Sequence, residues 1–148
     1  LNGEEYQRSV YVQVRRSRPL AVLDTFDLPT LDPNCTARSS STVAPQSLLM
    51  MNSDFILGAA KKLTDRLNAA AGSDMNERIR LAWNLLYARL PNDNELRAAN
   101  QFLTEEVARL TITAAAVTDP KQKPDPNQWA WTAFCQALLG SNEFLYID

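Results

Sequence analysis

The sequence predicts a mainly α domain: an irregular bundle of about four helices, wrapped by a long ordered N-terminal segment, with at most a minor β-strand. Two observations lead to this prediction. From Pro45 onward, apolar residues recur at three- and four-residue steps, as on the buried face of an amphipathic helix. Before that point, prolines interrupt the chain and no helical period is present. We therefore expect an extended wrap over residues 1–43 and a helical bundle over residues 44–148.

Length and charge limit the class of protein. The 148 residues, 45 % of them hydrophobic, suit one ordinary domain, so we expect a single domain over residues 1–148. Because the sequence opens without a methionine, we interpret it as a fragment of a longer protein. The net charge of −2 gives no general attraction to nucleic acid, and no apolar run is long enough for a membrane span.

The first quarter contains one strand signal and one long loop. Residues 9–15, SVYVQVR, alternate valines with other side chains and predict a single half-buried strand. Residues 17–43 contain prolines that prevent regular structure, together with too many apolar side chains for a disordered segment. We expect this loop to be ordered and to pack across the helices.

The first helix is predicted to begin at Ala44 or Pro45, after serines and a threonine that favour helix starts. Its apolar stripe continues without interruption to Gly72, which is expected to end it. A second helix is predicted from Asp74, a capping residue, to Pro91.

A third helix is predicted to start at Asn92, which has Glu95 at the spacing of a capping box, and to run to Leu110 or somewhat further. Asp125 and Pro126 predict the start of a fourth helix. The residues expected on its apolar face are Trp129, Ala133, Phe134, Ala137 and Leu138. The tail, EFLYID, is apolar enough that we expect Phe144, Leu145 and Tyr146 to dock back on the core.

The residue inventory excludes several kinds of active site. With 0 histidines the chain has no Ser-His-Asp or Cys-His nucleophile system and no HExxH zinc motif. With 4 glycines it has no phosphate-binding loop. We therefore expect no cofactor and no metal in this domain, and we expect the domain alone to be non-catalytic, with carboxylate chemistry as the enzyme class left open.

Acidic residues in the long loop are the best candidates for such chemistry. Asp24, Asp27 and Asp32 lie close together in the sequence, and Arg38 follows them. We interpret them as turn-forming and loop-capping residues with Arg38 as an ion-pair partner. The alternative is a hydrolytic carboxylate site, whose geometry the sequence does not define.

Aromatic residues and cysteines each leave two interpretations open. Trp83, Trp129 and Trp131 could form a carbohydrate-stacking platform, with Trp131 expected to be the most exposed, but aromatic residues at helical spacing are more often core. Cys35 and Cys135 could form a disulfide, stabilising by about 4 kcal/mol in the chain-entropy account, or be two ordinary buried thiols.

Four blocks of the sequence carry a resemblance to a known family: VYVQVRRSRPLAVLDTFDLP, NCTARSSSTVAPQSLLMMNSDFI, ARLPNDNEL and CQALLGSNEFLYID. They resemble the planctomycete-specific C-terminal domain of unknown function found in large exported proteins, many of which also carry cytochrome-c-like domains. The resemblance implies an exported, periplasmic or cell-envelope setting, which favours the disulfide. It also implies that any haem belongs to another domain, and it assigns no catalytic residue.

We expect the domain to be a non-catalytic interaction or structural module, docking against other domains of its parent protein or against an envelope protein. The alternative is part of a carbohydrate-active or hydrolytic protein, with carbohydrate as the partner and with Asp24, Asp27, Arg38 and Glu143 lining a cleft. The candidate binding or loop-ordering residues are Asp24, Asp27, Arg38, Gln46, Asn52, Asn142 and Glu143.

Overall fold

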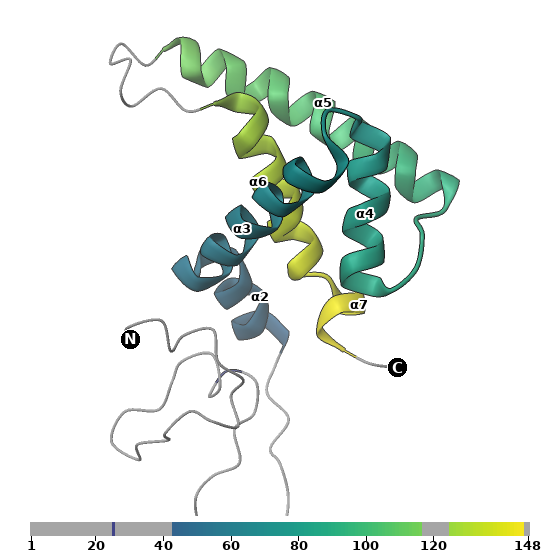
Figure 1. The fold of residues 1–148 in the computed structure, drawn as a ribbon. Coiled ribbons are helices and arrows are strands. Elements are labelled where there is room, and N and C mark those ends of the chain that lie inside the picture. Colours follow the sequence, from purple (N-terminus) through teal and green to yellow (C-terminus); the bar gives the residue numbers. More distant parts are fainter. Residues whose placement is uncertain (1–24, 26–42, 117–124, 147–148) are drawn as a thin grey trace, which may run out of the picture. The chain divides into compact units, whose positions relative to one another are not determined.

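A computed structural model describes Thr25 and residues 43–116 and 125–146 (Figure 1). Within these residues there are six helices and no strands, which confirms the mainly α prediction. The helices are α2 (Val43–Asn52), α3 (Asp54–Ala71), α4 (Met75–Tyr87), α5 (Asp93–Ala115), α6 (Pro126–Leu139) and α7 (Asn142–Leu145). The strand predicted over residues 9–15 lies outside the described residues, as does nearly all of the predicted wrap.

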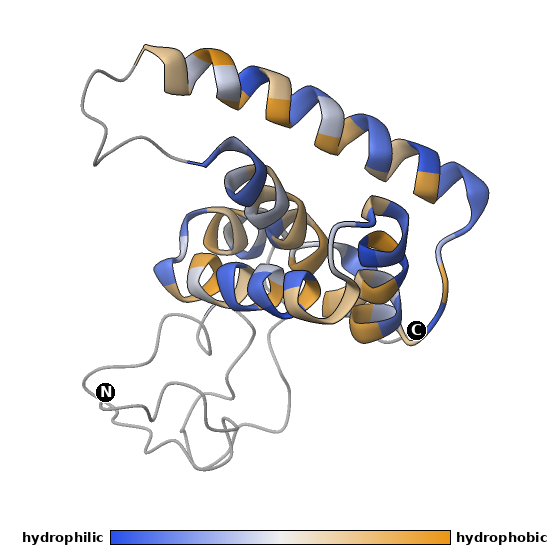
Figure 2. Cartoon of the chain, turned by 45° about the horizontal axis from the view of Figure 1, so that its top comes forward, coloured by the Kyte–Doolittle hydropathy of each residue, from blue (hydrophilic) through white to orange (hydrophobic). Residues whose placement is uncertain are grey.

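Two compact units make up the chain, Leu1–Leu49 and Met50–Asp148. The second unit contains α3 to α7 and the end of α2. None of the helices in the described ranges is long and apolar enough to cross a membrane. Figure 2 shows hydrophilic residues among the hydrophobic ones in the helices, and α3 and α4 carry the two kinds on opposite sides, as amphipathic packing requires.

The helix predicted from Pro45 to Gly72 is two helices, and this prediction was wrong at Ser53. Ser53 has an extended backbone, with φ of −78° and ψ of 125°, and stands directly before α3. Asn52, Ser53 and Asp54 are all residue types whose side chains compete for backbone groups, so they favour helix ends. The apolar period continues through this break, and the period alone therefore predicted one helix. Gly72 ends α3 as expected, with a φ of 60°.

Side-chain caps fix the starts of three helices as predicted. The Asp74 carboxylate accepts hydrogen bonds from two backbone N–H groups in the first turn of α4, and Asp125 accepts one in α6. Asn92 and Glu95 form a complete capping box at the start of α5. These caps satisfy donors that would otherwise lack helical partners.

Helix α6 is the centre of the second unit. It packs most extensively against α3 and α5, and also contacts α4 and α7 (Figure 1). Phe134 of α6 joins the aromatic part of this core, because its ring centroid lies 5.6 Å from Trp131, 5.9 Å from Trp83 and 6.1 Å from Phe102. The fully buried residues of the core include Ala60, Leu67, Ile79, Ala82, Ala130 and Cys135.

The buried face of α6 differs from the predicted one. Trp131 is only 4 % exposed, whereas Trp129 is 47 % exposed and Ala137 is also exposed. The prediction that Trp131 is the most exposed tryptophan was therefore wrong. Because α6 is apolar around most of its circumference, its sequence could not show which side faces the core. Trp131 packs edge-on against Phe134, and the Arg78 guanidinium lies 5.3 Å from the centre of its ring.

Candidate functional site

The turn between α4 and α5 carries a cluster of polar side chains that also reaches α5 and α7. Helix α4 ends at Tyr87, and the next residue, Ala88, has a left-handed backbone with φ of 54°. A left-handed residue reverses the chain direction at the end of a helix. Pro91 then prevents the helix from continuing, and Asn92 starts α5. Arg89 lies in this short turn, where its side chain can reach both α5 and α7.

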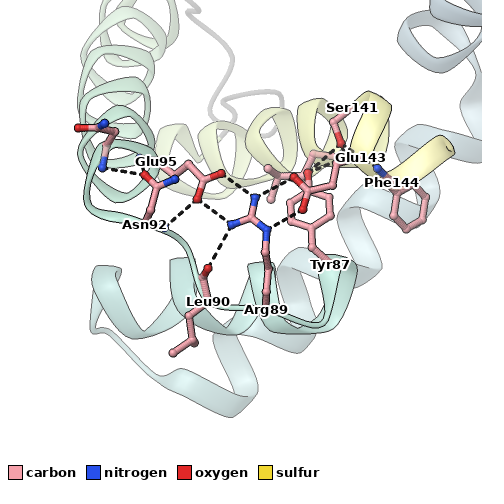
Figure 3. A network of polar contacts seen from close by, with 10 residues as sticks. Tyr87, Arg89, Leu90, Asn92, Glu95, Ser141, Glu143 and Phe144 are labelled. Atoms are coloured by element: carbon pink, nitrogen blue, oxygen red, sulfur yellow. Dashed lines mark hydrogen bonds and ion pairs between the residues drawn. The ribbon is translucent and has the colours of Figure 1, made fainter. Parts of the chain in front are cut away.

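Arg89 uses all of its N–H donors (Figure 3). Its Nε and Nη2 donate to the Glu143 carboxylate at 2.7 and 2.8 Å. Its Nη1 and Nη2 donate to the Glu95 carboxylate at 2.8 and 2.7 Å, and Nη1 also donates to the Leu90 carbonyl at 3.1 Å. A guanidinium group has five N–H donors in a planar fork, so these five bonds saturate it.

Tyr87 and Ser141 extend this cluster toward α6. The Tyr87 hydroxyl lies 3.1 Å from the Leu138 carbonyl and 2.9 Å from the Ser141 hydroxyl (Figure 3). Ser141 Oγ also accepts a hydrogen bond from the Phe144 N–H, which caps α7. We name Tyr87, Arg89, Glu95, Ser141 and Glu143 the Arg89 cluster; it joins α4, α5, α6 and α7.

Electrostatics in the cluster hold its carboxylates in the ionised form. Hydrogen bonds from Arg89, helped by the Asn92 N–H, lower the pKa of Glu95 to about 2. Hydrogen bonds from Arg89 also lower the pKa of Glu143, and the two carboxylates raise the pKa of Arg89. Burial raises the pKa of Tyr87 above its ordinary value. At neutral pH the cluster therefore holds one cation and two anions.

Acid should remove the stabilisation that Glu95 provides. The carboxyl has an ordinary pKa of 4.5 and a folded-state pKa of about 2, so its contribution is complete above about pH 5 and falls as pH drops toward 2. We expect the difference in unfolding free energy between the wild type and Glu95→Gln to shrink over this range, as measured by urea unfolding at successive pH values. A difference that stays constant from pH 7 to 2 would contradict this assignment.

A sequence model of PSD1, described as a protein of unknown function (DUF1553), matches residues 1–103. The match covers well over half of the 148 residues. The chain belongs to the PSD1 family. This confirms the predicted membership of a family of unknown function. The searches of curated proteins and of solved structures found no match.

The match places part of the Arg89 cluster within the PSD1 region. Tyr87, Arg89 and Glu95 lie inside residues 1–103, whereas Ser141 and Glu143 lie beyond them. The PSD1 match therefore includes the turn that carries the arginine.

Four of the predicted site residues of this PSD1 chain, Gln46, Asn52, Asn142 and Glu143, lie in the part that the structure describes. Glu143 belongs to the Arg89 cluster, and Gln46 is 5 % exposed and donates from Nε2 to the Thr25 carbonyl at 3.2 Å. Asn52 and Asn142 are exposed at the end of α2 and the start of α7. Asp24, Asp27, Asp32 and Arg38 lie outside the described residues, so the cleft hypothesis that uses them stays a prediction.

Residues outside the sequence prediction make the main polar contacts. Arg89 and Tyr87 meet Glu143 and Ser141 across about 54 positions, a separation that no local spacing rule covers. Gln136 donates from Nε2 to the carbonyls of Met50 and Met51, at 3.1 and 2.8 Å. In the Arg89 cluster, the sequence indicated the capping role of Glu95 and Glu143 as a candidate residue, but not the partner of either carboxylate. In the described part of the chain, no group of three or more acidic or cysteine side chains is placed to hold a metal ion.

The Cys135 side chain is fully buried on α6. Burial raises the pKa of the Cys135 thiol to about 11, although the Thr64 hydroxyl, 3.5 Å from the sulfur, lowers it somewhat. Its predicted partner Cys35 lies outside the described residues, so the disulfide stays a prediction.

We expect Cys135 to resist alkylation in the native protein. Burial and a pKa of about 11 suppress the reactive thiolate, and at pH 8 this slows alkylation by ~100-fold or more relative to an exposed thiol. Mass spectrometry of the peptide that contains Cys135 measures this directly. Alkylation after unfolding would identify a free thiol, and its absence without reductant would identify the Cys35 disulfide. Rapid alkylation of the native chain would contradict the burial of Cys135.

Proposed function

We propose that this PSD1 chain is a non-catalytic interaction or structural module of a larger exported multidomain protein. In this role it docks against other domains of its parent. The helical unit supplies a rigid body, and its polar groups stabilise that body instead of carrying out chemistry.

The saturation of Arg89 is the observation that carries this proposal. All five of its N–H donors are occupied by Glu95, Glu143 and the Leu90 carbonyl. An arginine that binds substrate needs free donors, and a general acid needs a pKa near the working pH. The pKa values of Glu95 and Glu143 are lowered instead, so neither carboxyl is suited to act as a general acid near neutral pH. Ion pairs of this kind hold the α4–α5 turn, α5 and α7 together, which supports a structural role for the cluster.

Exposed apolar side chains on α2 support docking. Leu48 and Met51 are 60 % and 70 % exposed, and they lie three positions apart, on one side of the helix. Large apolar side chains that lie together on a surface are typical of interaction sites. We assign this α2 face, defined by Leu48 and Met51, to contact with another domain of the parent protein.

The setting of the module follows from the sequence resemblance. We propose the finer family assignment as well, the planctomycete-specific C-terminal domain of large exported proteins, in the periplasm or cell envelope. In that setting haem belongs to a cytochrome-c-like domain elsewhere in the parent. An exported setting also favours the Cys35 to Cys135 disulfide.

Reassembly of the parent protein tests the docking proposal. The chain and the remainder of its parent are produced separately, mixed, and analysed by size-exclusion chromatography with light scattering. We expect the two parts to co-elute as a 1:1 complex. The double substitution Leu48→Lys and Met51→Lys should weaken this complex by about 10-fold or more, because it places charges in an apolar contact.

Ile112→Lys is the matched control, since Ile112 is 75 % exposed and belongs to a different helix, α5. It should leave the complex unchanged. Failure of the two wild-type parts to associate would overturn the docking proposal. Equal weakening by the control would overturn the assignment to the α2 face.

A further inference from the structure

Helix α7, Asn142–Leu145, is attached mainly through polar contacts. None of its four residues is buried, and Phe144 is 40 % exposed. The tail that was expected to dock on the core contacts α4 and α6, but the Phe144 ring stays partly exposed. The polar contacts that hold α7 include the double hydrogen bond from Arg89 to Glu143. At the preceding residue, the Ser141 hydroxyl contacts the Tyr87 hydroxyl and donates to the Leu138 carbonyl at 2.8 Å. An element held in this way can open without exposing much apolar surface.

Arg89 does not depend on Glu143 for its charge balance. Glu95 binds two guanidinium nitrogens of Arg89 and is itself fixed by the backbone N–H of Asn92, at 2.7 Å. If the Arg89–Glu143 contact breaks, Arg89 therefore stays paired with a well-positioned carboxylate, that of Glu95. Breaking the contact also moves the Glu143 carboxylate fully into water, and this side chain is already 45 % exposed in the closed state. Neither group would become a buried, unpaired charge, which is the usual large cost of breaking an ion pair.

We propose that α7 is a strap that opens from the helical unit while α3 to α6 stay folded, and that the Arg89–Glu143 pair is the contact that controls its opening. Opening frees the Nε and Nη2 edge of Arg89, a fork that matches a carboxylate. It also removes Ser141 from the Tyr87 hydroxyl. This end of the unit thus has two states. In the closed state Glu143 occupies the Nε and Nη2 edge of Arg89, and in the open state that edge is free.

Native-state hydrogen exchange on the 148-residue chain tests the strap. The reporters are the amides of Phe144 and Leu145, which donate to the Ser141 carbonyl at 3.1 Å, and the amide of Tyr146, which donates to the Asn142 carbonyl at 2.9 Å. We expect them to exchange at least about 100-fold faster than amides in the middle of α6, at rates that do not change with low urea concentrations, because local opening exposes little surface.

Two variants test whether Glu143 controls the opening. Glu143→Gln should speed exchange of the strap amides by about 3- to 10-fold and leave the α6 amides unchanged, since it weakens one partly exposed charged contact. Glu106→Gln is the control, because Glu106 pairs with Arg109 within α5. It should leave the strap unchanged.

Strap amides that share the rate and urea dependence of α6 would overturn the proposal. A fast strap that does not respond to Glu143→Gln would overturn the role of the Arg89 pair. Equal acceleration by Glu106→Gln would show general destabilisation and would overturn the proposal as well.

Discussion

Phe134→Ala should lower the unfolding free energy by about 3–5 kcal/mol, the range for truncating a large buried aromatic side chain. Phe134 is 4 % exposed, and its ring contacts Trp83, Trp131 and Phe102. Its removal leaves a cavity between α4, α5 and α6, and it also removes three aromatic contacts. Urea unfolding followed by far-ultraviolet circular dichroism measures the change.

Phe144→Ala is the matched control for this prediction. It makes the same chemical change at a side chain that is 40 % exposed on α7. We expect a loss below about 1 kcal/mol, in keeping with a surface substitution. Equal losses for the two variants would mean that Phe134 is not at the centre of the core.

Leu67→Ala should destabilise the protein by about 2–5 kcal/mol. Leu67 on α3 is fully buried, and α3 is one of the two helices that pack most extensively on α6. The loss combines the transfer free energy of the deleted atoms with the cavity that they leave. The same unfolding measurement gives the value.

Leu90→Ala provides the comparison, since Leu90 is 66 % exposed in the turn before α5. It should change stability by less than about 0.5 kcal/mol. If Leu67→Ala has an equally small effect, then α3 does not share the core of α6 as the structure shows.

The sequence predicted the helices where local signals were strong. Asp74, Asn92 and Asp125 cap helices as expected, because a side-chain cap depends on residues within one turn. The break at Ser53 was missed, since the apolar period on both sides is the same. The face of α6 was misassigned because burial of an apolar helix is decided by its neighbours and not by its own period.

The candidate site was harder to predict than the fold. Glu143 was singled out from sequence, but its partner Arg89 was not, because the contact joins residues 54 positions apart. A left-handed Ala88 directs Arg89 toward α7, and alanine gives no sequence signal for that backbone. The five donors of Arg89 are satisfied only when two helices, α5 and α7, and the turn are in place, which is a tertiary property.

The unfolding free energy of Arg89→Met tests most directly the claim that the Arg89 cluster is a structural tie. Methionine keeps much of the side-chain length but removes the guanidinium, which leaves Glu95 and Glu143 unpaired and close together. We predict a lower unfolding free energy at pH 7, with a loss larger than removal of a single exposed ion pair gives. Unchanged or increased stability would contradict the account, because polar groups kept at the expense of stability are typical of sites that bind or react.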